Sequence, residues 1–146
     1  MISNSSRYGI RAVVYIAGKT RKNENLGIKQ IAGDLDLPMP FLAKILQTLA
    51  RRKILLSYKG PHGGFALARQ PSDILLTDVV EAIDGKDVFS RCILHNENCK
   101  SADFNKSPCT LHGEYVVLRQ KIKTLFMERS ILDLVQKAAQ SDDILL

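Results

Sequence analysis

Residues 28–69 have the sequence IKQIAGDLDLPMPFLAKILQTLARRKILLSYKGPHGGFALAR, and the order of local patterns in this stretch decides the predicted fold. Apolar residues recur at helical spacing over Ile28–Leu35, which predicts a short helix. Pro38 and Pro40 disfavour helical geometry at the residues before them but suit the first turn of a new helix, predicted over Pro40–Lys53. Two helices joined by a tight turn, the second with a polar and basic outer face, are typical of a helix-turn-helix, although a plain helical hairpin has the same pattern.

The residues that follow predict a β-hairpin. Two apolar runs, Ile54–Tyr58 and Phe65–Arg69, flank a loop rich in Gly and Pro. A hairpin directly after such a helix makes a winged helix, in which the helix enters the major groove of DNA and the cationic hairpin tip reaches phosphates or the minor groove. The residues predicted to contact DNA are Lys29, Pro40, Ala43, Lys44, Gln47, Thr48, Arg51, Lys59, Gly60, His62 and Gly63.

Charge is distributed unevenly along the chain. Residues 1–69 hold 12 Lys and Arg against 3 Asp and Glu, whereas residues 70–146 hold 9 against 12. A basic half that coincides with the predicted winged helix favours a polyanionic partner, double-stranded DNA, over the alternative that many cytosolic proteins are simply basic.

Length and composition exclude several other classes of protein. The chain has 146 residues, 45% of them hydrophobic and 25% charged, as expected for one folded domain. No apolar run approaches the roughly 18 residues of a membrane span, and the N-terminus lacks the apolar core of a signal peptide. Three cysteines are an odd number, which argues against a disulfide scaffold. We therefore expect a cytoplasmic protein with no membrane partner.

Four further helices are predicted outside the opening stretch. They cover Ser6–Lys19, Asp78–Asp84, Leu111–Arg129 and Ile131–Ala139. The apolar residues of the first of these helices cover more than one of its faces, so we expect this helix to be central. Ser5 or Ser6 is predicted to cap it. Asp78 and Glu81 have the spacing of a capping box at the start of the second.

The long helix at 111–129 carries a candidate dimerisation seam. Tyr115, Leu118, Ile122 and Leu125 follow a 3-4-3 spacing, which resembles two heptads of a coiled coil. A helix with such a seam, projecting from a small domain, predicts a homodimer. The alternative is that the seam packs back onto the chain's own first helix.

The remaining cysteine loop, residues 86–108, shows no helical or strand period. Cys92, Cys99 and Cys109, followed by His112, have the spacing Cys-x6-Cys-x9-Cys-x2-His. Structural zinc sites usually begin with two ligands two to four residues apart, so these long gaps fit a loop around a larger group. Thiolates with an occasional imidazole are the ligands of iron–sulfur clusters, and we interpret these four residues as such a ligand set.

Three other interpretations of this loop stay open. His95 is a rival nitrogen ligand, and the cysteines could be ordinary cytosolic thiols. Arg91, with Lys100 and Lys106, is predicted to lower nearby thiol pKa values. The Cys109–His112 pair could mimic an enzyme's nucleophile and base, but no orienting group or oxyanion donor is evident, so we predict that the protein is not an enzyme.

Several of these motifs resemble the IscR/NsrR-type family of bacterial winged-helix transcription regulators. The resemblance spans nearly the whole chain and is most specific at Arg7–Ala12, Ile28–Ala32, Lys59–Ala68 and Asp78–Ile83. It implies a homodimer clasped by the helix near 111–129, a cluster bound by the cysteine loop, and DNA affinity that depends on the state of that cluster.

Position by position, the resemblance assigns the ligands of a 2Fe–2S cluster. Cys92, Cys99 and Cys109 match the family's thiolates, and His112 matches the fourth ligand of the IscR type. The gaps of six and nine residues are longer than the family's usual five and five. An aspartate that NsrR-like members supply from the first helix has no match here, which favours the IscR-like set.

The family's DNA-contacting positions also differ in this chain. Pro38 and Pro40 stand where hydroxyl residues often open the recognition helix, and Lys59 stands where the wing carries arginine. Lysine is a more strongly hydrated cation and suits a narrow minor groove less well. The DNA sequence that this protein recognises therefore cannot be predicted from that of the family.

The predicted protein is mainly α-helical with a small β-wing. Residues 1–85 form the winged helix-turn-helix, 86–110 the cluster-binding loop, and 111–146 the dimerisation and C-terminal helices, packed with the first helix. The predicted function is a homodimeric transcription regulator whose operator binding responds to iron, redox state or nitric oxide through the cluster, with iron–sulfur donor proteins as further partners. The alternative is a cluster-free winged-helix regulator that senses through thiols or a protein partner.

Overall fold

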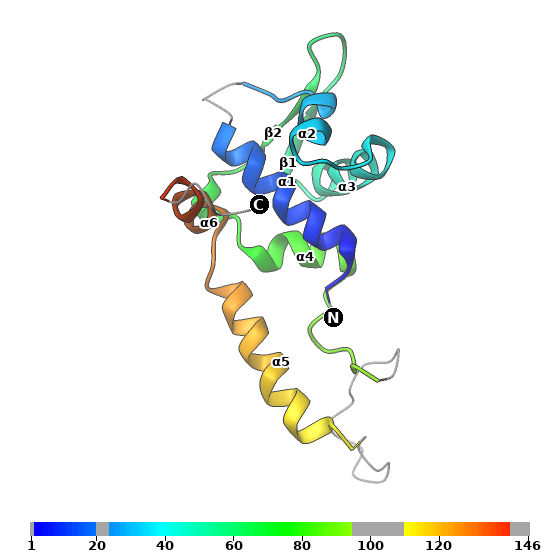
Figure 1. The fold of residues 1–146 in the computed structure, drawn as a ribbon, viewed down its shortest axis with the longest axis vertical. Helices are drawn as coiled ribbons and strands as arrows, with labels where there is room; N and C mark the ends of the chain where they lie inside the picture. Colours follow the sequence, from blue (N-terminus) through cyan, green and yellow to red (C-terminus); the bar gives the residue numbers. More distant parts are fainter. Residues whose placement is uncertain (1, 20–23, 95–109, 141–146) are drawn as a thin grey trace.

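The computed structural model describes residues 2–19, 24–94 and 110–140 and confirms the predicted fold class. The elements are α1 (Asn4–Lys19), α2 (Ile28–Asp34), α3 (Met39–Arg51), β1 (Leu55–Tyr58), β2 (Gly64–Leu67), the short 3-10 helix η1 (Pro71–Asp73), α4 (Leu76–Asp84), α5 (His112–Met127) and α6 (Ile131–Ala139). Figure 1 shows a body built from α1–α4, α6 and the hairpin, from which α5 projects as a long arm. None of the helices in the described ranges is long and apolar enough to span a membrane.

Helix α1 lies at the centre of the body, as its apolar surface predicts. It packs against α3, α4, α6 and β2, and Ala12–Ile16 are buried. The cap predicted at Ser5 or Ser6 is wrong, because the helix begins two residues before Ser6. The Ser3 hydroxyl oxygen accepts from the Ser6 N–H at 3.1 Å, so Ser3 caps the helix.

Helices α2 and α3 form the predicted helix-turn-helix. The Arg11 guanidinium donates to the Leu35 carbonyl at 3.1 Å, and the Tyr15 hydroxyl donates to the Asp34 carboxylate, so α1 holds the end of α2 and the turn. Burial and the bond to Asp34 raise the pKa of Tyr15. Helix α3 ends at Arg51, before the predicted end, because Lys53 has φ +58° and leaves the helical conformation.

The hairpin is shorter than predicted. In the antiparallel register Leu55 pairs with Leu67 and Tyr58 with Gly64. The chain before α2 joins its edge, since Leu26 and Phe65 exchange two backbone hydrogen bonds of 2.9 Å. A side chain on Gly64 would collide with the Leu26 carbonyl, so this position requires glycine.

Helix α4 begins at Leu76, so the capping box predicted at Asp78 and Glu81 is wrong. Asp78 is instead the third helical residue, and its carboxylate accepts from the Leu75 N–H at 3.2 Å. The apolar Leu75 therefore occupies the cap position, which is why the sequence pattern misplaced the start. Gly85, with φ +91°, ends the helix as predicted.

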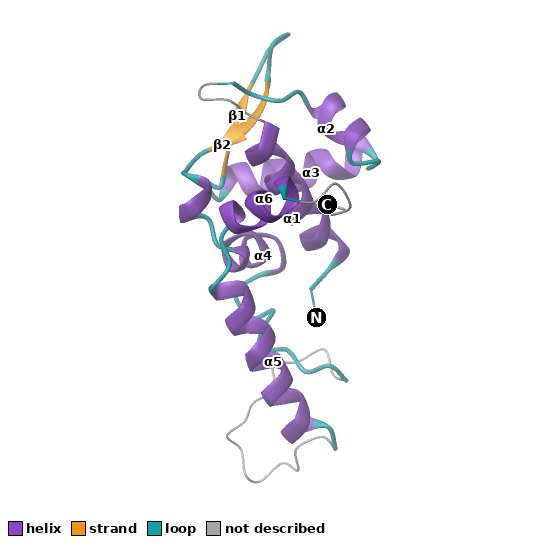
Figure 2. Ribbon diagram, turned by 60° about the vertical axis from the view of Figure 1, so that its left-hand side comes forward, coloured by secondary structure: helices purple, strands orange, loops and turns teal. Residues whose placement is uncertain are grey.

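The C-terminal part of the described chain returns to the body after α5. Ser130 caps α6 with a reciprocal pair of bonds: its hydroxyl oxygen accepts from the Asp133 N–H at 3.2 Å, and the Asp133 carboxylate accepts from the Ser130 N–H at 2.8 Å. The Ile131 N–H donates to the Ile74 carbonyl at 2.8 Å, which joins this turn to the residues before α4. Figure 2 shows α5, which precedes this turn in the chain, extending away from the body.

Side chains of α3 and α4 pack against α1 at Gly9, so Gly9→Val is expected to destabilise the protein. A side chain there would collide with Ile83 and meet Ile45 at 3.4 Å. We expect the free energy of unfolding to fall by about 1–3 kcal/mol, the usual cost of overpacking. Gly18→Val is the matched control, since a Cβ there meets only Val135 at 3.9 Å. Equal unfolding free energies for the two variants in urea titrations would contradict this packing.

Candidate nucleic-acid interface and cysteine segment

Helix α3 has one buried and one exposed stripe. Leu42, Ile45, Leu46 and Leu49 are buried against the body. The opposite stripe consists of Pro40, Lys44, Gln47 and Arg51, which are all exposed at 4-3-4 spacing, so they lie along one side of the helix. Ala43 and Thr48 flank this stripe and are half-buried.

The hydroxyl of Thr48, one of the predicted DNA-contacting groups, is engaged within its own helix. It donates to the Lys44 carbonyl at 2.9 Å and accepts from the Arg51 guanidinium at 3.3 Å. Thr48 therefore helps to orient Arg51 on the exposed stripe. Back-bonding of this kind is common for threonine inside helices, and residue spacing alone does not reveal it.

The loop of the hairpin carries the predicted cations at its tip. Lys59, Gly60 and His62 are exposed, and Gly60 has φ +98°. Gly63 is half-buried and donates to the Gly60 carbonyl at 2.9 Å, so the loop closes on itself. In Figures 1 and 2 the hairpin projects from the same end of the body as α2 and α3.

Tyr58 is a candidate DNA contact that the sequence analysis did not include. It is 48% exposed at the end of β1, directly before the loop. Leu56, two residues earlier on the same face of the strand, is also exposed, but so is Ser57, so burial along β1 does not alternate and gave no clear signal. A phenol hydroxyl in this place is a donor of the kind that binds phosphate oxygens.

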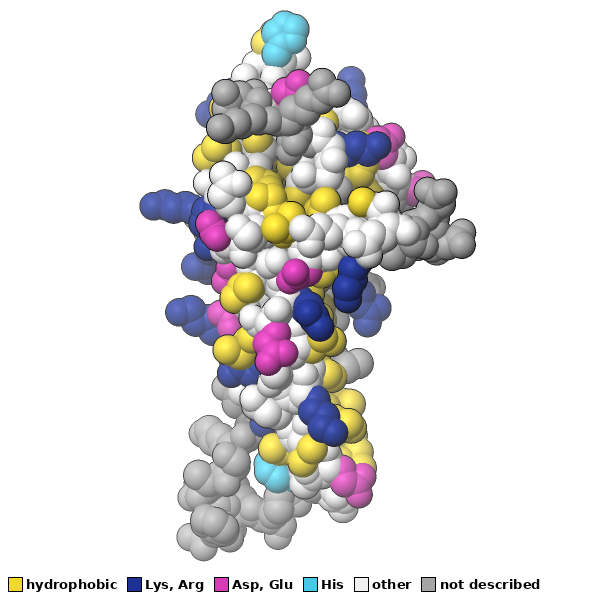
Figure 3. Space-filling model, turned by 90° about the vertical axis from the view of Figure 1, so that its left-hand side faces the viewer, with side chains coloured by type: hydrophobic (Ala, Val, Ile, Leu, Met, Phe, Trp, Pro, Cys, Tyr) yellow, Lys and Arg dark blue, Asp and Glu magenta, His cyan; other side chains and the backbone are white. Residues whose placement is uncertain are grey.

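Lys29 adds a further basic side chain at the end of the body that carries α3 and the hairpin. Lys29 is exposed on α2, the first helix of the helix-turn-helix. Figure 3 shows Lys and Arg side chains projecting along one edge of the molecule. Helix α3, the hairpin tip and Lys29 together offer donors and positive charge for a phosphate backbone and for base edges.

Two of the four predicted cluster ligands lie in the part of the chain that the structure describes. Cys92 is half-buried at the end of the segment that follows α4, and His112 is the first residue of α5. Cys99, Cys109 and the rival ligand His95 lie outside the described residues. Within residues 2–19, 24–94 and 110–140, no three His, Cys, Asp or Glu side chains form a group that could hold a metal ion.

Arg91, which was predicted to lower nearby thiol pKa values, forms hydrogen bonds to acidic and carbonyl groups around the end of α4. It forms two 3.0 Å hydrogen bonds to the Asp87 carboxylate and donates to the Asp84 carbonyl at 3.1 Å. The hydrogen bond from Arg91 lowers the pKa of Asp87, and Asp87 in turn raises the pKa of Arg91. Lys100 and Lys106 lie outside the described residues.

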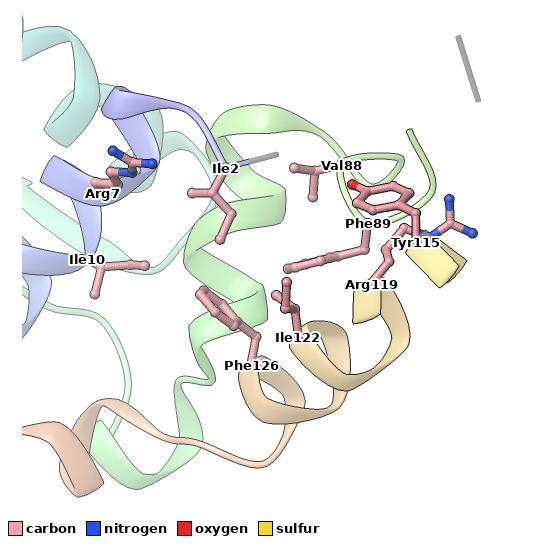
Figure 4. A pocket seen from close by; sticks show the side chains of 9 residues that line it. All are labelled: Ile2, Arg7, Ile10, Val88, Phe89, Tyr115, Arg119, Ile122 and Phe126. Atoms are coloured by element: carbon pink, nitrogen blue, oxygen red, sulfur yellow. The ribbon is translucent and has the colours of Figure 1, made fainter. Parts of the chain in front are cut away.

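Helix α5 divides its predicted seam between two faces. Tyr115 and Ile122 lie with Arg119 and Phe126 around a cavity of about 250 Å³ that also touches α1 and the segment after α4. Figure 4 shows Phe126 and Ile122 pointing toward Phe89 across this cavity. This half of the seam faces the chain's own body across the cavity, although Ile122 is still 39% exposed.

The other half of the seam faces outward. Leu118 and Leu125 are 57% and 50% exposed, and Leu111, one heptad earlier, is also exposed. Val116, Val117 and Thr124 line a shallow groove beside them. An apolar stripe at seven-residue spacing on a projecting helix is typical of a coiled-coil contact.

Comparison with known proteins identifies the family. Residues 2–137 match the family model Rrf2, described as iron-dependent transcriptional regulator. The chain belongs to the Rrf2 family. A protein of Aquifex aeolicus, described as an HTH-type transcriptional regulator, is 31% identical over 135 residues, which cover 92% of this chain and 91% of that one.

Solved structures of similar fold include two named regulators. CymR, the global cysteine regulator of B. subtilis, superimposes with a TM-score of 0.75 at 21% identity, covering 94% of this chain and 97% of that one. IscR of T. potens also gives a TM-score of 0.75, at 20% identity, covering 100% and 93%. Rrf2 proteins are DNA-binding transcriptional regulators and not enzymes, so the predicted class and the resemblance are confirmed.

Proposed function

We propose that this Rrf2 protein is a homodimer that binds operator DNA through α3 and the hairpin, and that the state of its cysteine segment (residues 86–110) changes its affinity for that DNA. In this proposal residues 1–85 recognise DNA, and α5 with α6, within residues 111–146, joins the two copies. The observation that carries it is the exposed α3 stripe of Pro40, Lys44, Gln47 and Arg51 beside a cationic hairpin tip. Gln47 can pair with a base edge, whereas the cations bind phosphates or guanine.

The donor set of the cysteine segment fits an iron–sulfur cluster by its chemistry. Cys92, Cys99, Cys109 and His112 offer three thiolates and one imidazole. These residues would hold a 2Fe–2S cluster, which when bound supplies a group sensitive to electrons and oxidants. Iron supply, oxidants and nitric oxide are the signals we expect, because each acts on iron or on its thiolate ligands. Iron–sulfur donor proteins are the expected partners for loading.

Anaerobic purification followed by DNA titration tests this proposal. The fresh protein is assayed for iron, sulfide and visible absorbance, and it then selects a binding fragment from a random-sequence DNA library. We expect a coloured protein whose affinity for that fragment changes when a chelator removes the iron. A colourless protein that stays iron-free after reconstitution would reject the cluster. If its affinity then responded to thiol oxidants, the thiol-sensing alternative would replace it.

Lys59→Ala and Gln47→Ala are expected to weaken DNA binding in different ways. Lys59 lies at the exposed hairpin tip, so its loss should weaken binding to all sequences and reduce the salt slope by about 0.9. Gln47 lies on the exposed α3 stripe, so its loss should relax discrimination at one base pair, at a cost of about 1–3 kcal/mol. Titrations at several salt concentrations on the selected fragment and on single-base variants separate the two effects. An unchanged salt slope in Lys59→Ala would place the phosphate contact elsewhere.

A further inference from the structure

A group of five polar residues joins three helices directly before Cys92. We name Ser3, Asp84, Asp87, Arg91 and Arg119 the polar junction. Its first contact joins α4 to α1: the Asp84 carboxylate accepts from the Ser3 N–H at 2.9 Å and from the Ser3 hydroxyl. Since Ser3 caps α1, the last residue of α4 holds the first turn of α1 in place.

The second contact joins the end of α4 to the residue before Cys92. The Arg91 guanidinium binds both oxygens of the Asp87 carboxylate and also the Asp84 carbonyl at the C-terminus of α4. A cation at this end of a helix satisfies an orphan carbonyl and complements the helix dipole. A shift of the backbone directly before Cys92 would therefore act, through Arg91, on Asp84, the residue that holds α1.

The third contact joins α5 to the same segment. The Arg119 guanidinium donates to the Ser90 carbonyl at 3.0 Å and lies 5.8 Å from the centre of the Tyr115 ring. Figure 4 shows Arg119 and Tyr115 side by side, next to Phe89 of this segment. Helix α5 thus grips the chain two residues before Cys92.

The packing of α1 carries this connection to the recognition helix. Gly9 lies three residues, less than one turn, after Ser6, where Ile45 of α3 and both Val79 and Ile83 of α4 pack against it. A change in the tilt of α1 relative to α4 therefore moves α3. In a two-fold dimer joined by α5, the same change alters the separation of the two recognition helices, which must match the half-site spacing.

We propose that the polar junction transmits the state of the cysteine segment to α3, with Arg119 and Arg91 as its positioning residues. This inference rests on the proposed function, because it requires that the cysteine segment exists in two states. Arg91 and Asp87 are 39% and 45% exposed, and ion pairs this exposed contribute little to folding. Variants of the junction should therefore fold and keep their DNA-binding surface intact.

Arg119→Gln and Arg91→Gln test the junction. The measured quantity is the response ratio, the Kd of the chelator-treated protein for the selected DNA fragment divided by the Kd of the iron-loaded protein. We expect the response ratio of each variant to be closer to one than that of the wild type by a factor of at least about five. The iron content and the Kd of the chelator-treated protein should stay within about twofold of the wild type. Hydrogen exchange of the Ser6 amide should also become faster in the iron-loaded variants. Arg119→Lys, which keeps one donor, should restore part of the ratio.

Arg69→Gln is the matched control, because it breaks the Arg69–Asp78 ion pair of 3.3 Å, which has similar exposure and includes none of the residues of the polar junction. It should leave the response ratio unchanged. A wild-type ratio in Arg119→Gln and Arg91→Gln would overturn the junction while leaving the proposed function in place. Loss of iron from these variants would also overturn it, since the junction would then only hold the ligands. A ratio of one in the wild type would reject the proposed function itself, and the junction with it.

Discussion

Replacing Leu118 and Leu125 together with glutamate is expected to give a monomer that binds operator DNA about 100-fold more weakly or worse. These two leucines are 57% and 50% exposed, on a helix that projects from the body. They lie one heptad apart and so share one side of α5. In a two-fold pair the partner would present the same side of its α5 to them. Two glutamates in that contact would bring like charges together where apolar surface was buried.

The size of the effect follows from the two half-sites of a dimeric operator. When two binding modules are joined, the second binds as an intramolecular step, which raises the overall affinity by about 10²–10⁴. A monomer loses that gain but keeps its own α3 and hairpin. We therefore expect the double variant to retain weak, salt-sensitive DNA binding and a circular dichroism spectrum like that of the wild type.

Light scattering after size exclusion, combined with DNA titration, measures both parts of this prediction. The control is Met127→Glu, which adds a glutamate to α5 at a position that does not line the groove beside Leu125. Met127 is 50% exposed, so the control also removes an exposed apolar side chain. If the control became monomeric and the leucine variant stayed dimeric, the contact would lie on the opposite face of α5.

The sequence predicted the order of the elements because their signals are local. Apolar spacing located α2 and α3, and the prolines at 38 and 40 placed the turn between them. A helix that is apolar nearly all round predicted the central position of α1. Ser130 could be predicted as the cap of α6 because its partner, Asp133, is only three residues away.

The errors arise where a partner is distant in the sequence. Ser3 caps α1, and it also binds Asp84, 81 residues away, which no local pattern reveals. The partners of Arg91, the Asp87 carboxylate and the Asp84 carbonyl at the end of α4, were likewise not evident from residue spacing. Periodicity found the apolar positions of α5 but not which of them face the chain's own body, since heptad spacing is the same for both.

Cys92→Ser is expected to abolish the response of the protein to iron while leaving its fold and its basal DNA binding intact. Serine has nearly the same shape as cysteine, and Cys92 is only half-buried, so little packing is lost. A hydroxyl is a poor substitute for a thiolate, because it stays protonated near neutral pH and is a harder ligand. With one of three thiolates removed, we expect iron to be lost on gel filtration and the response ratio to fall to one.

The expected size of this loss is the whole coupling between the two sites. Allosteric coupling is usually about 1–3 kcal/mol, so a wild-type ratio of roughly 5–150 should disappear in Cys92→Ser. Ile93→Ser is the matched control: it introduces the same hydroxyl one residue later, at a side chain that is 47% exposed, and keeps the thiol. Iron content, visible absorbance and DNA titrations with and without chelator are compared for the three proteins.

The outcomes separate the two sensing chemistries, because a cluster and a thiol switch depend on Cys92 in different ways. Loss of iron together with loss of the response supports cluster sensing. If the wild type holds no iron, yet responds to thiol oxidants and loses that response in Cys92→Ser, the thiol itself is the sensor. If Cys92→Ser keeps both DNA binding and the full response, neither chemistry operates at Cys92. The polar junction would then end at a residue that carries no signal, although it would still hold α1, α4 and α5 together.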